Sequence, residues 1–263
     1  MKIVKNKWIG YLIFFMIPIF LINVIGYWPP SYNHYIYPIG EISIGIYQYI
    51  DNTGQEIPFY QCTTGYSAVK SGIKGIVTAG HCFDGTLGDF TPPAVWWWKV
   101  YQPNNLNINW FLGSPSNVYG DLAYIDSAFI PNSNVRPKIL TLDPYGNPTE
   151  LPVKGYIFWW NVPLGEQVFK TGSSSGVSGG MILFKSRFYG DLRWVIGIEN
   201  MSVSEGDSGG PVYTRRLVRI DSLYTYEIYL LSILSAIDTQ QNIVLTISVD
   251  KIRSEVGIFP ITG

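Results

Sequence analysis

The sequence predicts an all-β fold, an antiparallel sandwich or barrel. Apolar stretches are numerous and short, and segments rich in turn residues separate them. Glycine and proline, the residues that most often interrupt helices, number 27 and 17 among the 263 residues. Hydrophobic residues make up 47% of the chain, which is enough for a sizeable core. Since few apolar stretches have helical periodicity, strands joined by turns are the expected elements.

The strand pattern begins near residue 41, where residues 41–50 (EISIGIYQYI) alternate apolar and polar positions. One helix is expected near the C-terminus, because Ser248 can cap it, an apolar stripe follows at helical spacing, and Gly257 can end it. The stripe consists of Val249, Ile252 and Val256. The other strand candidates are KGIVTAGHC, AVWWWKVYQ, LAYIDSAFIP, KGYIFWW, GMILF, RWVIGIE, YEIYLLSILSAI and NIVLTISV.

The N-terminal segment, residues 1–28, differs from the rest of the chain. Lysines at positions 2, 5 and 7 precede an uncharged apolar run at residues 8–28. At about 1.5 Å per residue, a helix of this length can cross a bilayer core of roughly 30 Å. A basic flank before an apolar run is also how a secretory signal begins, so we expect a hydrophobic helix that is either a signal-anchor or a cleaved signal peptide. In both cases the positive flank places residues 29 onward outside the cytoplasm, with residues 29–40 as a linker.

Charge and cysteine content limit the classes of partner. The net charge is -1 and 14% of residues are charged, which gives no electrostatic case for binding nucleic acid. The two cysteines, Cys62 and Cys82, can form one disulfide in an oxidising compartment or remain two free thiols.

The segment EGDSGGPV, residues 205–212, places Ser208 in a glycine-rich turn. A serine hydroxyl is a weak nucleophile until a base takes its proton. Of the two histidines, His34 lies in the linker, whereas His81 lies in VTAGHCFDG at the end of an apolar stretch, so His81 is the candidate base. The string GDSGG also fits the nucleophile elbow of α/β-hydrolases. That fold is excluded because its histidine follows the serine in the chain, and both histidines here precede Ser208.

Together, TAGHC and GDSGGPV resemble the paired signature of chymotrypsin-like serine proteases, in the family's order. Two further segments resemble the streptogrisin and alpha-lytic branch: residues 62–82, similar to a disulfide-closed segment before the histidine, and residues 165–182, similar to a hairpin before the serine. The resemblance covers roughly residues 40–260. It implies two six-stranded antiparallel β-barrels, at roughly 41–135 and 136–263, with the active site between them and a C-terminal helix. It also implies a disulfide between Cys62 and Cys82.

The resemblance implies site residues as well. His81 would be the general base, Ser208 the nucleophile, and an aspartate would orient the histidine. Asp121 and Asp126, both in YGDLAYIDSAFIP, fit the family's pattern. Asp126 is favoured, because its distance from the preceding WFLGS segment suits the turn that the family needs there. The backbone N–H groups of Gly206 and Ser208 would form the oxyanion hole.

Further positions would support the serine turn and the substrate. Asp207 resembles the family's buried acid, which pairs with a freed N-terminal amine in some members and with an internal base in others; its partner here is not identified. Ser202 would lie at the base of the primary specificity pocket, and since it is not an aspartate, a preference for Lys or Arg is not expected. The segment LLSILSAID, residues 230–238, resembles the strand that binds the substrate backbone, and Ile237 would narrow the pocket toward small apolar side chains. The substrate-binding residues on this strand would be Ser235, Ala236 and Ile237.

Three functions compete. The favoured one is an extracytoplasmic serine endopeptidase, secreted or anchored to the outer face of the cell membrane through residues 8–28. It would act on protein or peptide substrates as a monomer, without a cofactor or metal. The second is a catalytically silent binding module on a protease fold, against which the presence of a histidine, a serine and an acid argues. The third is a metal- or carbohydrate-binding surface protein that uses His81, Cys82, Asp84 and the tryptophans at 96–98, but this spacing matches no common metal site.

Overall fold

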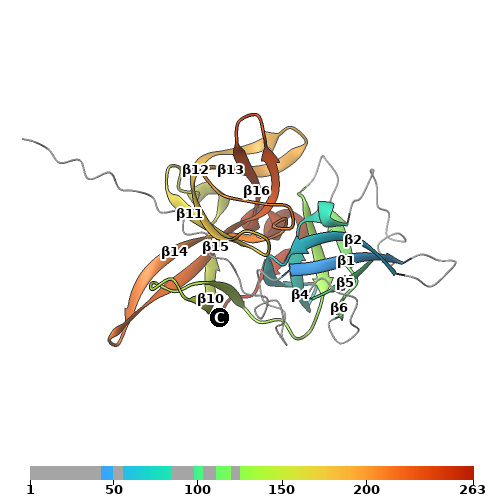
Figure 1. The fold of residues 1–263 in the computed structure, drawn as a ribbon, viewed down its shortest axis with the longest axis horizontal. Coiled ribbons are helices and arrows are strands. Elements are labelled where there is room, and N and C mark those ends of the chain that lie inside the picture. Colours follow the sequence, from blue (N-terminus) through green and yellow to red (C-terminus); the bar gives the residue numbers. More distant parts are fainter. Residues whose placement is uncertain (1–42, 50–55, 84–97, 103–110, 120–124) are drawn as a thin grey trace, which may run out of the picture.

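The computed structural model describes residues 43–49, 56–83, 98–102, 111–119 and 125–263 (Figure 1). Strands dominate these residues, which confirms the all-β prediction. No helix in these ranges is long and apolar enough to cross a membrane. Several predicted features lie outside the described residues: the apolar segment 8–28, the linker 29–40 with His34, Asp84, Trp96, Trp97 and Asp121.

Two sheets built mainly from the N-terminal half lie on the right of Figure 1. Each consists of antiparallel pairs, and β17, the last strand of the chain, pairs with β3. The C-terminal end therefore returns to the first half and ties the two halves together. The four-stranded sheet has the order β2 (Glu56–Thr63), β1 (Ser43–Tyr49), β5 (Trp98–Tyr101) and β6 (Phe111–Gly113). The five-stranded sheet has the order β17 (Ile258–Pro260), β3 (Tyr66–Lys70), β4 (Ile73–Thr78), β8 (Ser127–Pro131) and β7 (Asn117–Tyr119).

The C-terminal half forms one eight-stranded sheet that closes on itself, because its first strand, β14, also pairs with β15. The closed ring consists of β14, β11, β12, β13, β16 and β15, and the sheet continues beyond β15 with β10 and β9. The β10–β15 pair is parallel, unlike the other pairs of this sheet. The order is β14 (Pro211–Ile220), β11 (Gln167–Gly172), β12 (Gly176–Tyr189), β13 (Leu192–Glu199), β16 (Ile243–Ser248), β15 (Leu223–Asp238), β10 (Pro148–Tyr156) and β9 (Lys138–Leu142).

The C-terminal helix has the predicted position, with α1 at Val249–Lys251 followed by a π-helical segment, η6, at Ile252–Val256. Gly257 ends it with a φ of 73°, a left-handed conformation that glycine adopts without strain. The expected cap by Ser248 is wrong. Ser248 is the last residue of β16 and pairs with Ser232, so its buried hydroxyl makes no capping hydrogen bond. Two shorter 3-10 segments are η2 (Gly80–Cys82) and η5 (Trp159–Asn161).

The hydrophobic core extends across both halves. One cluster of buried side chains joins residues of β3, β4 and β8, such as Tyr66 and Phe129, to residues of β15 and the C-terminal helix, such as Ile233 and Ile252. Two further clusters lie within the first and the second half. Because the shared cluster packs the halves against each other, residues at their junction can be held in fixed relative positions.

Candidate active site

The strand β4 and the disulfide of the next residue fix the position of His81. His81 lies in the short 3-10 turn η2, immediately after β4. The next residue, Cys82, forms the predicted disulfide with Cys62 at the end of β2. Both cysteines are buried. The turn is therefore covalently fixed to a neighbouring strand, whereas the His81 side chain remains 38% exposed.

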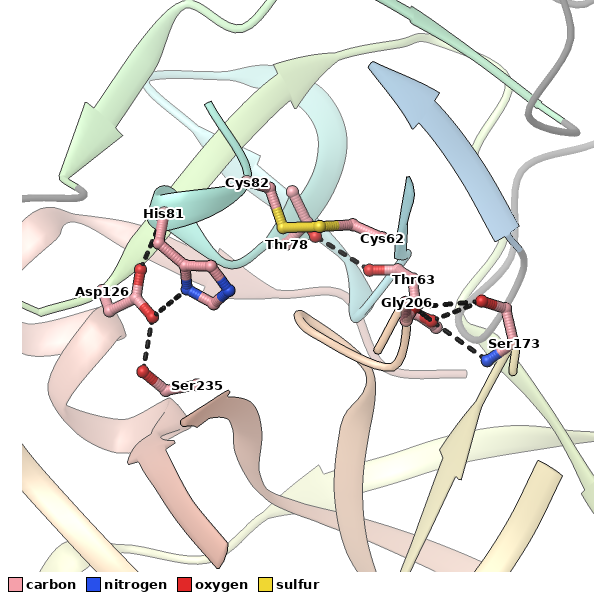
Figure 2. Close-up of a disulfide and its surroundings, with 9 residues drawn as sticks. All are labelled: Cys62, Thr63, Thr78, His81, Cys82, Asp126, Ser173, Gly206 and Ser235. Carbon is pink, nitrogen blue, oxygen red and sulfur yellow. Dashed lines mark hydrogen bonds and ion pairs between the residues drawn. A yellow bond between two sulfur atoms is a disulfide. The ribbon is translucent and has the colours of Figure 1, made fainter. Parts of the chain in front are cut away.

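Asp126 reaches His81 because of strand pairing. It directly precedes β8, which pairs with β4 in antiparallel register, so the start of β8 lies beside the end of β4. The Asp126 carboxylate accepts two hydrogen bonds from His81, one from Nδ1 at 2.7 Å and one from the backbone N–H at 2.8 Å (Figure 2). The Ser235 hydroxyl donates a third at 2.5 Å. Since Nδ1 donates to the carboxylate, Nε2 of the neutral imidazole is left as a proton acceptor.

The electrostatics of this pair favour an ionised aspartate. Burial by itself raises the pKa of Asp126, but the adjacent His81 charge and the hydrogen bonds from His81 and Ser235 outweigh burial. The pKa of Asp126 therefore lies below the usual value for an aspartate. The second candidate acid, Asp121, lies outside the described residues.

Ser208 lies in a tight loop between β13 and β14. The Asp207 N–H donates to the Ser204 carbonyl at 3.1 Å, and the Gly210 N–H donates to the Asp207 carbonyl at 2.9 Å, so two turns overlap. Gly206 and Gly209 have φ angles of 91° and 84°, which favour glycine. A Cβ on Gly209 would also lie 2.0 Å from the Thr78 hydroxyl. The glycines of the GDSGG motif are therefore required by backbone geometry and close packing.

The Ser208 side chain is partly exposed, and among the described residues its hydroxyl makes no hydrogen bond to His81 in this conformation. Such contacts are often long without a substrate and shorten in the substrate complex. Backbone bonds hold the residue itself. Its carbonyl accepts from the Thr63 N–H at 2.8 Å, and the next residue, Gly209, donates to the Leu234 carbonyl at 2.9 Å. The serine loop is thus attached to strands of both halves.

Asp207 has a partner that the sequence did not identify. Lys170, on β11, places its ammonium 2.8 Å from Asp207 Oδ2, and both side chains are buried. The same carboxylate accepts from the backbone N–H groups of Ser174, Ser175 and Ser204 at 2.9, 3.1 and 3.0 Å. One signal was available in the sequence, because Lys170 lies two residues after the apolar Val168 and the two share a face on a strand. That face is buried in the structure, where a charged residue needs a partner.

A small cavity of about 50 Å³ lies beside Ser208. Its wall includes the three predicted residues Ser235, Ala236 and Ile237. Ser202 is not part of the lining, and its carbonyl instead accepts a hydrogen bond from the Ser178 hydroxyl at 2.7 Å. Val244 was missed, because it reaches the cavity only through its pairing with Ile237 across β15 and β16. The other lining residues are Val203, Ser204, Asp207 and Leu234.

The alternative of a metal site finds no support in the described residues. They contain no group of three or more His, Cys, Asp or Glu side chains placed to hold a metal ion. Cys82 is engaged in the disulfide, and His81 is engaged with Asp126. Trp98, the described member of the tryptophan run, is buried and packs edge-on against Phe83.

The arrangement of sheets, with a histidine–aspartate pair beside a serine loop, is that of the double β-barrel fold of chymotrypsin-like serine proteases. No protein-family model matches the sequence. Among solved structures, Protease A of Thermobifida fusca has a TM-score of 0.54 and 20% identity over 86% of this chain and 98% of its own. A Nocardiopsis protease has a TM-score of 0.55 and 18% identity, over 85% of this chain and 98% of its own. The chymotrypsin of Cellulomonas bogoriensis has a TM-score of 0.53 and 20% identity, over 86% and 98% of the two chains. These similarities support the chymotrypsin-like double β-barrel fold.

Proposed function

We propose that the protein is a serine endopeptidase that acts outside the cytoplasm, with His81 as general base, Asp126 as its orienting acid and Ser208 as nucleophile. The observation that carries the proposal is the doubly hydrogen-bonded pair of His81 and Asp126 beside the Ser208 loop. The fold shared with Protease A of Thermobifida fusca and the order of the three residues in the chain support the same function. The disulfide between Cys62 and Cys82 supports an oxidising location.

The geometry suits acyl transfer in two stages. His81 Nε2 takes the proton of Ser208 Oγ as the oxygen attacks the peptide carbonyl, and Asp126 stabilises the resulting imidazolium. The tetrahedral oxyanion is bound by the N–H groups of Gly206 and Ser208. His81 then gives its proton to the leaving amine, and an acyl group remains on Ser208. A water molecule, activated by His81 in the same way, hydrolyses the acyl-enzyme.

The substrate preference follows from the cavity beside Ser208. The cavity is small, about 50 Å³, and the branched side chains of Ile237 and Val244 form part of its wall. Among the described residues, Asp207 is the only acidic one that lines the cavity, and it is already paired with Lys170. We therefore assign the protein a preference for small apolar residues on the acyl side of the cleaved bond.

Labelling with a fluorophosphonate probe tests the function. The full chain should be labelled covalently, because the probe reacts with an activated serine, and Ser208→Ala should abolish labelling. Ser186→Ala, on β12 and remote from the cavity, is the matched control and should label like the parent. An unlabelled parent chain would instead support the silent binding module.

A further inference from the structure

Thr63, at the end of β2, forms an unusual set of contacts with the serine loop. Its side chain is fully buried, and its hydroxyl donates a hydrogen bond to the Gly206 carbonyl at 2.6 Å (Figure 2). The hydroxyl oxygen accepts from the Ser173 N–H at 3.0 Å and lies 2.9 Å from the Ser173 hydroxyl. That hydroxyl in turn lies within 3.1 Å of the same Gly206 carbonyl. The Gly206 carbonyl is therefore enclosed by two hydroxyl groups from separate segments.

The main chain of Thr63 holds the other side of the loop. Its N–H donates to the Ser208 carbonyl at 2.8 Å, and its own carbonyl accepts from the Thr78 hydroxyl at 2.8 Å. One residue of the first half thus contacts the carbonyls of both Gly206 and Ser208. These are the two residues whose N–H groups are proposed to bind the oxyanion.

Gly206 is the part of this loop that needs restraint. In the turn from Ser204 to Asp207, the third residue, Gly206, has a positive φ and the second, Glu205, does not. This combination defines a type II turn. A glycine can adopt the type I form as readily, and in that form the peptide between Glu205 and Gly206 is reversed. The Gly206 N–H would then point in the opposite direction. An oxyanion hole is effective only when its donors are already directed at the reacting oxygen.

We propose that Thr63 is a positioning residue for the oxyanion hole, acting through its hydrogen bond to the Gly206 carbonyl and supported by Ser173. The inference rests on the proposed protease function. The bond holds the Gly206 carbonyl, and with it the Gly206 Cα position from which the Gly206 N–H is directed. A shift of this residue away from Thr63 leaves a buried acceptor without a partner. Thr63 does not touch the reacting atoms, so its effect reaches the substrate only through Gly206.

The chain offers variants that separate positioning from packing. Thr63→Val removes the hydroxyl and keeps the shape, including the methyl group that lies 3.4 Å from a Cβ position on Gly210. Thr63→Ser keeps the hydroxyl and removes that methyl group. Thr246→Val is the matched control, because it removes another buried hydroxyl, which donates to the Ile196 carbonyl at 3.1 Å on the β13–β16 pair.

The test measures kcat and KM of the full-chain variants on a peptide amide with alanine at the cleaved bond. Thr63→Val should lower kcat by about 10-fold, the equivalent of one lost hydrogen bond, with KM within about twofold of the parent. Thr63→Ser should restore kcat to within about twofold, and Thr246→Val should leave it unchanged. Ser173→Ala should lower kcat by about threefold, because the Thr63 bond remains.

Two results would overturn the inference: a Thr63→Val enzyme with parental kcat, or a Thr63→Ser enzyme as slow as Thr63→Val. If Thr63→Val does not fold, Ser173→Ala decides, and a parental kcat in that variant overturns the inference. Failure of the proposed function is recognised separately, since the parent chain would then not react with the fluorophosphonate, and the inference would fall with it. If the parent chain reacts with the fluorophosphonate but the Thr63 variants keep the parental kcat, the inference about Thr63 is wrong and the proposed function stands.

Discussion

The Lys170 ammonium lies 2.8 Å from the Asp207 carboxylate, and the two buried side chains form an ion pair directly beneath the serine loop. Asp207 also accepts backbone hydrogen bonds from both neighbouring segments, at Ser174 and at Ser204. The cation that fixes this acid is therefore an internal residue of the second half.

We expect Lys170→Met to unfold more easily than the parent and to lose the reactivity of Ser208. Removing one partner of a buried pair leaves an uncompensated charge, which costs about 3–5 kcal/mol of unfolding free energy. Urea unfolding measures this loss, and fluorophosphonate labelling of the folded fraction measures the serine. Lys138→Met breaks the more exposed pair with Glu150 (3.4 Å) and should cost under about 1 kcal/mol. Parental labelling in Lys170→Met would show that the pair does not support the loop.

The sequence predicted the parts of the site that depend on local motifs. The TAGHC segment contains both the histidine and a disulfide cysteine, and its preceding apolar residues form β4 as expected. The GDSGG segment requires glycine at positive φ, and Gly206 and Gly209 have that conformation. These features are encoded within a few residues, so a single sequence is enough to find them.

The features that the sequence did not reveal depend on partners distant in the chain. Lys170 meets Asp207 only after β11 pairs with β14, and Val244 meets Ile237 only in the register of β15 and β16. Ser248 was expected to cap a helix, but strand pairing continues through it and turns its side chain inward. Register and pairing set these contacts, and neither is determined by local composition.

Asp126→Asn should lower kcat by roughly 10⁴-fold while the protein remains folded. The amide cannot hold the imidazole in the tautomer that leaves Nε2 free to accept the serine proton. Asp121→Asn serves as the control and should retain activity, since Asp126 accepts the hydrogen bonds from His81 Nδ1 and from the His81 backbone N–H. Hydrolysis of a peptide amide measures both variants. If Asp121→Asn were the inactive one, the assignment of the acid would be reversed.

The lowered pKa of Asp126 predicts an acid dependence of stability. The folded state prefers the ionised carboxylate, so this group contributes stability above its unfolded pKa of about 3.9, and the contribution is lost as pH falls through the lower folded pKa. The difference in unfolding free energy between the parent and Asp126→Asn should therefore narrow as pH falls below about 4. Urea unfolding from pH 7 to 2.5 measures it. A difference that stays constant over this range would argue against an ionised Asp126.

Ile237→Gly should widen the substrate preference. Ile237 is 46% exposed at the edge of the cavity, opposite its strand partner Val244, so its removal enlarges the cavity without opening the core. The ratio of kcat/KM for substrates with phenylalanine to those with alanine at the cleaved bond should rise by about 10-fold or more, in keeping with the removal of several methyl or methylene groups from a pocket. Ile220→Gly, at the exposed end of β14, controls for the loss of an exposed isoleucine and should leave the ratio unchanged. An unchanged ratio in Ile237→Gly would mean that another wall, such as Val244, limits the side chain that the cavity admits.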